Sequence, residues 1–449
     1  MNEVKQDKVI VRYPPSPTGK LHVGNIRTFL FNYLFAKKMG GDIVMRFEDT
    51  DTERSKKEYE EEILKTLDKL GLTFDRGPFR QTERTEFYID AIETLLKNDD
   101  AYEAEESNDG SGNKTIRFRN PNKKVTYKDV VRGDITIDTT DFGDFVIARS
   151  KTNPLYHLTV VVDDLDMGIT HVIRGEDHIT STPRQILLIE ALGGNIPTYA
   201  HMSFTIGKDK KKLSKRHGAT NYSQFEGLGY VPDALINYMA LLGWNEGNGV
   251  EKEFYTREEL INAFSLERLN NSPAMFSYDK LDDLNKKHIL VMDKDKYKEK
   301  VLEFISPKNK SNFQDEEKKS DKIINLVIKE KISKFSEIID MEQSGEFEYF
   351  FMNPGVSDED LVFKTDGIDK ALQLLIGVEK IVKDIEENNW NKDFLKESLL
   401  NYAKENGIGS VLHPLRTLLT GAKNSPDPFI MMEVLGKEET MERLHLRLS

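Results

Sequence analysis

A loop rich in proline and glycine carries the first residues whose types and spacing could do chemistry. It reads PSPTGKLHVGN over residues 15–25 and lies between a predicted strand and a predicted helix. Gly19 and Gly24 let the backbone approach a ligand closely, and the N-terminus of the helix that follows favours a phosphate group. His22 could donate a hydrogen bond to phosphate oxygens as negative charge develops on them. The alternative is a Pro/Gly turn with an incidental histidine.

A run of basic residues is the second candidate. Residues 208–216 read KDKKKLSKR; they follow the strand-like stretch YAHMSFTI, and Gly218 comes shortly after them. A solvated lysine-rich loop is the ordinary interpretation of such a run. Beside a phosphate site, however, a cationic loop would stabilise the charge of a transferring phosphoryl group.

Two further segments place charged residues where predicted strands end. They are RFEDTD over residues 46–51 and VIRGEDH over residues 172–178. In an open parallel sheet the carboxyl ends of the strands form the ligand-binding edge. Each segment on its own is also compatible with an ordinary acidic turn and a surface ion pair.

The elements that must position these segments alternate between strand and helix in the first half of the chain. Strands are expected at Val9–Tyr13, Asp42–Phe47, Tyr156–Val162 and His171–Arg174, and a helix at Asn25–Met39. This alternation is typical of a parallel α/β sheet. Three helices are expected to begin with a capping box. The paired residues of these boxes are Ser55 and Glu58, Thr182 and Gln185, and Thr256 and Glu259.

The composition changes between about residues 100 and 155. A segment rich in Gly, Asn and Ser precedes short predicted strands at Ile116–Arg119 and Phe145–Arg149. This pattern is typical of an insertion between two halves of one sheet. From about Asp233 onward the pattern is mostly helical, and beyond residue 291 few strand signals remain. The expected fold class is therefore α/β: a Rossmann-like parallel sheet with an α+β insertion, followed by an all-α C-terminal region.

The overall composition excludes several classes of protein. The chain has 449 residues, of which 38% are hydrophobic, and this argues against a disordered chain. Its formal net charge of −13 excludes a histone-like polycation, and the lack of cysteine excludes disulfides, thiolate zinc sites and cysteine nucleophiles. No apolar run approaches the length of a membrane span, and the N-terminus has no apolar signal core. We therefore expect a cytoplasmic protein with no membrane partner.

Together the four segments resemble one family in order and content, the bacterial-type glutamyl-tRNA synthetases, which are class I aminoacyl-tRNA synthetases. HVGN matches the family's His-Ile-Gly-His-type signature, and KLSKR matches its Lys-Met-Ser-Lys-Ser-type signature. Further segments also look like sequences of this family. They are RYPPSPTG, GGDIVMRFEDTD, VIRGEDHITSTPRQ and, near the C-terminus, PLRTLLTG. The resemblance runs from about residue 9 to about residue 445 and so covers nearly the whole chain.

The resemblance implies roles for residues at the matching positions. His22 and Lys215 would be catalytic, the first on the ATP phosphates and the second on the departing pyrophosphate. The ATP-binding residues would be Pro15, Thr18, Gly19, His22, Gly24, Asn25, Lys212, Leu213, Ser214, Lys215 and Arg216. The glutamate-binding residues would be Arg12, Ser16, Glu48, Tyr156 and Arg174. Two arginines suit a carboxylate side chain because each guanidinium can pair with it in a bidentate fork, and Glu48 would take the substrate's ammonium group.

The sequence departs from the family's pattern in three places. Asn25 takes the fourth position of the first signature, and Tyr13-Pro14 replaces the commoner Phe-Ala. Many members also carry a Cys-x-Cys pair in the insertion, with later residues that complete a zinc site. Here Ala104 and Glu106 stand at the cysteine positions and the segment that follows is largely missing. We therefore expect a shortened insertion without structural zinc.

The function that the resemblance implies is ligation of glutamate to tRNA. L-glutamate would react with ATP, bound together with Mg²⁺, to give glutamyl-adenylate. The glutamyl group would then pass to the 3′-terminal adenosine of tRNA(Glu), and the enzyme is expected to be a monomer. The expected domains are the two halves of the catalytic domain (1–100 and 156–200), an acceptor-end-binding insertion (101–155), a signature-loop and stem-contact region (201–290) and a helical anticodon-binding domain (291–449).

Two alternatives stay open at this point. One is the truncated paralogue that glutamylates a modified base of tRNA, although it lacks the anticodon-binding region that the last 150 or so residues would form. The other is a synthetase-like RNA-binding or regulatory protein without catalysis, against which His22 and Lys215 argue.

Overall fold

The chain folds into two compact units, Met1–Leu284 and Asn285–Ser449, which we call the first and the second unit. The computed structural model describes residues 8–105, 114–211, 213, 218–247, 249–422 and 425–448. The basic signature residues Lys212, Ser214, Lys215 and Arg216 lie outside the described residues.

A parallel sheet forms the centre of the first unit. Its strands are β1 (Ile10–Tyr13), β2 (Asp42–Phe47), β3 (Arg76–Arg80), β10 (His171–Gly175) and β11 (Thr198–Met202). The pairs β1–β2, β2–β3 and β10–β11 are all parallel. Because the backbone amide of Thr170 donates to the carbonyl of Ile10 at 2.9 Å, β10 lies beside β1 and joins the two halves of the sheet. This arrangement confirms the predicted Rossmann-like parallel sheet.

A hairpin from the predicted insertion extends this sheet beyond β11. Strand β6 (Lys124–Asp129) pairs in parallel with β11 at Tyr199 and Asp129, and in antiparallel fashion with β7 (Gly133–Asp138). The amide of Val130 adds a hydrogen bond of 2.9 Å to the carbonyl of Tyr199. The insertion is therefore part of the sheet that carries the candidate site.

The other strands of the insertion form a separate antiparallel sheet in the order β4-β5-β8-β9. Their bounds are Ala101–Glu105, Lys114–Phe118, Phe145–Ser150 and Asn153–Pro154. Strands β5 and β8 confirm the predicted pieces at Ile116–Arg119 and Phe145–Arg149. Elsewhere in the unit β12 (Thr205–Ile206) pairs with β13 (Ala274–Met275).

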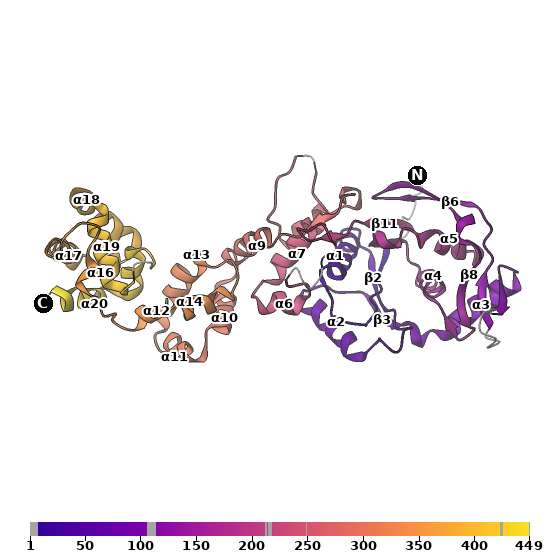
Figure 1. The fold of residues 1–449 in the computed structure, drawn as a ribbon, viewed down its shortest axis with the longest axis horizontal. Helices are drawn as coiled ribbons and strands as arrows, with labels where there is room; N and C mark the ends of the chain where they lie inside the picture. The colour runs from indigo at the N-terminus through magenta and orange to yellow at the C-terminus, as the bar shows by residue number, and fades with distance from the viewer. Residues whose placement is uncertain are drawn as a thin grey trace. The chain divides into compact units, whose positions relative to one another are not determined.

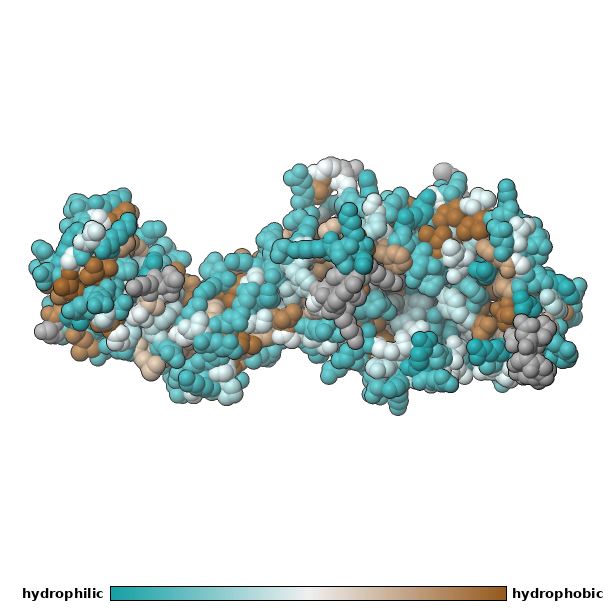
Figure 2. All heavy atoms as spheres, viewed as in Figure 1, coloured by the Kyte–Doolittle hydropathy of each residue, from teal (hydrophilic) through white to brown (hydrophobic). Residues whose placement is uncertain are grey.

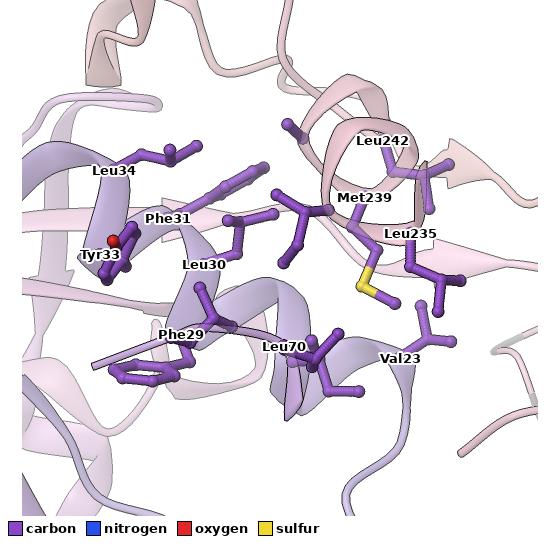
Figure 3. Close-up of a cluster of buried hydrophobic side chains, with 14 of the residues drawn as sticks. Val23, Phe29, Leu30, Phe31, Tyr33, Leu34, Leu70, Leu235, Met239 and Leu242 are labelled. Atoms are coloured by element: carbon purple, nitrogen blue, oxygen red, sulfur yellow. The ribbon is translucent and has the colours of Figure 1, made fainter. Parts of the chain in front are cut away.

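Helix α1 packs directly on the central sheet. It spans Val23–Lys38 and lies against β1, β2 and β10. Figure 1 shows α1 next to β2. Most of its residues are buried, as expected for a helix covered on nearly every side. Figure 3 shows Leu30 and Phe31 of α1 facing Leu235 and Met239 of α7 (Pro232–Leu241). The other helices that begin in this unit are α2 (Lys57–Lys69), α3 (Thr85–Lys97), α4 (Tyr156–Asp166), α5 (Thr182–Ala191), α6 (Tyr222–Gly227), α7 (Pro232–Leu241), α8 (Arg257–Ala263) and α9 (Tyr278–Leu290).

The strand predicted at Tyr156–Val162 is wrong, because this segment is the first part of helix α4. Val160, Val161 and Val162 are all buried, since α4 packs between α3, α5 and β8. A helix buried on every side gives a continuous apolar run, which sequence periodicity does not distinguish from a buried strand. The predicted strand at His171–Arg174 is confirmed as β10.

Two of the three predicted capping boxes are also wrong. Helix α2 begins at Lys57 with no side-chain cap, and the buried hydroxyl of Ser55 has no hydrogen-bond partner among the described residues. Thr182 is the first residue of α5 rather than its cap, and its hydroxyl is used by neighbouring groups of the candidate site. The capping box of Thr256 and Glu259 at the start of α8 is confirmed.

The second unit is helical throughout the part that the structure describes, which confirms the predicted all-α region. Its helices are α10 (Lys294–Phe304), α11 (Pro307–Asp315), α12 (Glu317–Lys322), a π-helical turn (Ile323–Ile328), α13 (Lys329–Lys331), α14 (Glu337–Gln343), α15 (Glu348–Phe351), α16 (Asp358–Leu361), α17 (Ile368–Lys383), α18 (Lys392–Asn406), α19 (Ile408–Thr420) and α20 (Pro428–Leu448). Polar residues dominate the face of this unit seen in Figure 2, with small apolar patches between them. Over the described ranges of both units, every helix is too short or too polar to cross a bilayer.

Candidate active site

A cleft of about 590 Å³ in the first unit gathers most of the predicted site residues. It opens where the carboxyl ends of β1 and β10 meet the N-terminus of α1, the ligand-binding edge of such a sheet. The predicted residues that line it are Arg12, Pro15, Ser16, Thr18, His22, Gly24, Asn25, Glu48, Tyr156, Arg174 and Leu213. Gly19 is the described residue of the predicted set that does not line it.

His22 is the N-cap of α1. Its Nδ1 accepts a hydrogen bond of 3.1 Å from the amide of Gly24. In the neutral imidazole the proton then sits on Nε2, which can donate to a phosphate oxygen at the helix N-terminus. A Cβ atom at Gly24 would lie 3.0 Å from the imidazole, so glycine leaves the room that this ring occupies.

The two signature segments meet at this helix start. The amide of Val23 donates to the carbonyl of Thr220 at 2.9 Å, just after the basic signature. Within the signature, the amide of Leu213 donates to the carbonyl of Thr205 at 3.1 Å, and Leu213 lines the cleft. The chain is therefore anchored beside the cleft at Leu213 and again at Thr220, after the basic signature.

A buried ion-pair network lies beneath the cleft and holds Arg12. Asp164 accepts from Nε of Arg12 at 3.4 Å and from Nη1 of Arg46 at 2.9 Å. The Nη1 atom of Arg12 is buried with no hydrogen-bond partner among the residues that the structure describes. Leaving a buried guanidinium nitrogen unpaired is costly unless a ligand satisfies it. This nitrogen therefore points to an anionic ligand in the cleft.

Asp163, the neighbour of Asp164, fixes the floor of the network. It accepts hydrogen bonds from Nε2 of Gln81 at 2.9 Å, from Nε of Arg84 at 2.7 Å and from the hydroxyl of Tyr88 at 3.1 Å. It also lies 3.3 Å from Nε of Arg46 in an ion pair whose side chains are both fully buried. Three groups from the segment 81–88 and one from β2 thus converge on one carboxylate.

With Asp177, Glu48 is one of two acidic residues among the described ones that line the cleft. Its Oε1 lies 3.6 Å from Nη2 of Arg46 and has no hydrogen-bond partner within the described part of the chain. Its amide donates to the carbonyl of Pro15 at 3.1 Å, which fixes the end of β2 against the first signature loop. Burial raises the pKa of Glu48 to about 7, although Arg46 and Arg12 attract the charged form. A cationic ligand group would stabilise the ionised carboxylate.

Arg174 lies at the end of β10 and is almost fully buried. Its Nε donates to Nε2 of His201 at 3.1 Å, and its Nη2 donates to the hydroxyl of Thr182 at 2.8 Å. Its guanidinium carbon also lies 5.5 Å from the centre of the Tyr199 ring. These contacts leave Nη1 for a ligand in the cleft.

Tyr156 and His178 form the wall next to Arg174. The Tyr156 hydroxyl lies 3.2 Å from Nδ1 of His178, and both residues line the cleft. Burial, together with the charge of Arg174, lowers the pKa of His178 to about 4, so its imidazole is neutral near pH 7. The wall is therefore polar but uncharged.

Comparisons with known proteins agree with this geometry. Residues 8–110 and 103–283 match the model of the catalytic domain of class I tRNA synthetases (E and Q), and residues 296–448 match an anticodon binding domain. Glutamate–tRNA ligases from Carboxydothermus hydrogenoformans and Aquifex aeolicus are 36% and 38% identical to the chain; each match covers 97% of the chain, and 99% and 98% of the relative. The chain belongs to the class I glutamyl-tRNA synthetases.

A solved structure of a member of this family supports the same assignment. The glutamate tRNA ligase from Elizabethkingia meningosepticum, crystallised in complex with its amino acid, superposes with a TM-score of 0.81 at 30% identity. The match covers 98% of this chain and 99% of that one. The resemblance that the signatures indicated is thereby confirmed, as is the class of enzyme, a ligase that forms aminoacyl-tRNA.

Several residues of this synthetase site were not predicted from the sequence. Asp163 and Asp164 belong to them, and the signal that could have found them is two adjacent acids directly after an apolar run. Asp129 and His201 gave no comparable signal, because each lies in a strand segment without a motif and the two are 72 positions apart in the sequence. Within the described ranges no group of three or more His, Asp or Glu side chains is placed to hold a metal ion.

Proposed function

We propose that this glutamyl-tRNA synthetase binds its amino acid through Arg12, Ser16, Glu48, Tyr156 and Arg174. The observation that carries the proposal is the pairing of unsatisfied groups of opposite sign in one buried cleft. Among the described residues, the buried Nη1 of Arg12 and the buried Oε1 of Glu48 have no hydrogen-bond partner, although Glu48 lies 3.6 Å from Arg46. An amino acid zwitterion supplies the complementary carboxylate and ammonium groups.

Arg174 would meet the side-chain carboxylate of the substrate. A carboxylate that leaves water for a buried site needs both a counter-charge and hydrogen bonds, and a guanidinium supplies both. Glutamine has a neutral amide there, so it would leave the buried cation underpaired. Enzymes discriminate most strongly between two substrates when the wrong one leaves buried polar groups of the site unpaired.

The ATP phosphates would lie at the N-terminus of α1. We assign them to Pro15, Thr18, His22, Gly24, Asn25 and Leu213 of the cleft, with Gly19 in the same loop and Lys212, Ser214, Lys215 and Arg216 of the basic signature. Magnesium would arrive with the ATP phosphates and stabilise their charge. His22 and Lys215 would act on the negative charge of the departing pyrophosphate.

The reaction that this arrangement supports has two steps. The α-carboxylate of glutamate attacks the α-phosphorus of ATP in line, and pyrophosphate leaves. The 2′-hydroxyl of the terminal adenosine of tRNA then attacks the adenylate carbonyl, and AMP leaves. Neither step needs a protein nucleophile, so positioning and charge stabilisation would provide the rate enhancement.

The tRNA would contact several regions of the chain. We propose the insertion at residues 101–155 for the acceptor end, residues 201–290 for the stem and residues 291–449 for the anticodon. The anticodon assignment is supported by the family model that matches residues 296–448. The proposal extends to a monomeric enzyme of the cytoplasm, which rests on the family resemblance.

Exchange of labelled pyrophosphate into ATP, measured with and without tRNA(Glu), tests this function, since the family resemblance implies that bound tRNA is required for the first step. We expect exchange that requires L-glutamate and transfer of labelled glutamate to the 3′ end of tRNA(Glu), with glutamine a poor substitute. The truncated paralogue would instead label an internal tRNA base, and a non-catalytic RNA-binding protein would give no exchange. Either result would overturn the proposal.

A further inference from the structure

His201 is buried completely between the insertion and Arg174. It lies on β11, and its Nδ1 is 2.6 Å from Oδ2 of Asp129, the last residue of β6. On the other side of the ring, its Nε2 is 3.1 Å from Nε of Arg174. A continuous chain of side chains therefore runs from a strand of the insertion to the arginine of the cleft.

The hydrogen-bond donors fix the direction of this chain. Asp129 is held as an acceptor by the backbone amides of Val131 and Arg132 at 2.9 Å and of His201 at 3.1 Å. Burial opposes its ionisation, but the His201 contact and these amides shift the pKa of Asp129 downward. Because the ionised carboxylate only accepts, Nδ1 of His201 carries the proton and Nε2 offers a lone pair to Arg174.

Thr182 completes the support of the guanidinium. Its hydroxyl donates to the carbonyl of His178 at 2.9 Å, so its oxygen accepts from Nη2 of Arg174 at 2.8 Å. Two of the three guanidinium nitrogens of Arg174 thus bond to fixed acceptors. Two such bonds determine the plane of a guanidinium, so they also fix the direction of its third nitrogen, here Nη1.

Both of these acceptors are uncharged. Burial lowers the pKa of His201, and the Arg174 cation lowers it further, against the opposing effect of the hydrogen bond that His201 donates to Asp129. Arg12, in contrast, contacts the carboxylate of Asp164. A neutral imidazole therefore orients Arg174 without neutralising it, and the full positive charge remains for a ligand.

We propose that Asp129 and His201 are positioning residues that aim Arg174 at the substrate's side-chain carboxylate and thereby set the preference for glutamate over glutamine. The inference rests on the proposed role of Arg174 in binding glutamate. It gives the insertion a part in amino acid selection, because Asp129 comes from strand β6.

Two substitutions of His201 separate its two contacts. In His201→Asn the side-chain amide can occupy the Nδ1 position and contact Asp129, but nothing remains to accept from Arg174. In His201→Gln the amide oxygen can reach the Nε2 position and accept from Arg174, while the Asp129 contact is lost. The matched control is His171→Asn at the start of the same strand as Arg174, outside the cleft.

We expect His201→Asn to raise the KM for glutamate about tenfold or more, the scale of losing a hydrogen bond to a charged group, and to leave the KM for ATP within about twofold. The ratio of kcat/KM for glutamate over glutamine should fall with it. His201→Gln should recover most of the loss, and His171→Asn should match the unmodified enzyme. The double variant Arg174→Lys with His201→Asn tests the coupling between the two residues. Lysine lacks the guanidinium nitrogen that donates to His201, so His201→Asn should change the KM for glutamate little further in that background.

Equal increases in both KM values, or equal losses in His201→Asn and His201→Gln, would overturn the positioning role and indicate a purely structural histidine. If His201→Asn does not fold, Asp129→Asn takes its place, because it keeps an acceptor for His201 but removes the charge that fixes the tautomer. An unmodified protein that never uses glutamate would overturn the proposed function itself. Normal glutamate use with unchanged selectivity in the variants would overturn only this inference.

Discussion

Lowering the pH through neutrality should weaken glutamate use by way of Glu48. The carboxylate must be ionised to receive the substrate's ammonium group, and burial raises its pKa to about 7 in the free protein. With that pKa, roughly nine tenths of the molecules are ionised at about pH 8 and roughly one tenth at about pH 6. The kcat/KM for glutamate should therefore fall about tenfold over this range, because this ratio reports the pKa values of the free enzyme.

The assay is pyrophosphate exchange with glutamate as the varied substrate, at constant ionic strength and saturating ATP. The imidazoles of His178 and His201 do not account for such a transition, because burial shifts both pKa values downward. The matched control is Glu48→Gln, which should be a poor enzyme with a flat profile between these pH values. A flat profile for the unmodified protein, or the same inflection in Glu48→Gln, would refute the reasoning.

Three substitutions test other parts of the site. Arg174→Gln should raise the activation barrier that kcat/KM for glutamate reports by about 2–4 kcal/mol and reduce discrimination against glutamine. The KM for ATP should stay close to normal. Kinetics with both amino acids on folded protein test this. Lys215→Ala should slow adenylate formation roughly 10²-fold, and Lys211→Ala in the same basic run should not, as single-turnover measurements would establish. Asp163→Asn should lower the free energy of unfolding by about 3 kcal/mol or more in urea titrations, since it removes the carboxylate that Arg46 and Arg84 share; a smaller loss would mean that the network relaxes around the amide.

The parts of the molecule that were predicted correctly share a local signal. The strand before the first signature, the helix after it and the next strand are marked by Pro, Gly and the change of apolar period. The capping box at Thr256 depends only on the residues up to Glu259. Such features are decided within a few residues, so the sequence alone is sufficient to predict them.

The parts that were missed depend on contacts across the fold. Tyr156–Val162 lies in a helix packed between α3, α5 and β8, and α2 begins after Ser55, where the amide of Lys56 donates to the distant carbonyl of Pro17. Asp163 is significant only where Gln81, Arg84 and Tyr88 converge on it, which no spacing reveals. The signatures predicted which residues face the ligand, whereas the groups that hold them became visible only in three dimensions.

The order of strands in the central sheet also has a consequence for how the chain folds during synthesis. Strand β1 is joined to β10 by contacts between residues 160 positions apart, such as Ile10 and Thr170. Strand pairing over such a separation is slow, because a long loop must close before the contact forms. While the chain emerges from the ribosome, β1 to β3 therefore have no partner on the β1 side until about 170 residues are available. Until then that edge is open to pairing with other chains, so the N-terminal third of the protein is the stage at which misassembly or chaperone capture is most expected.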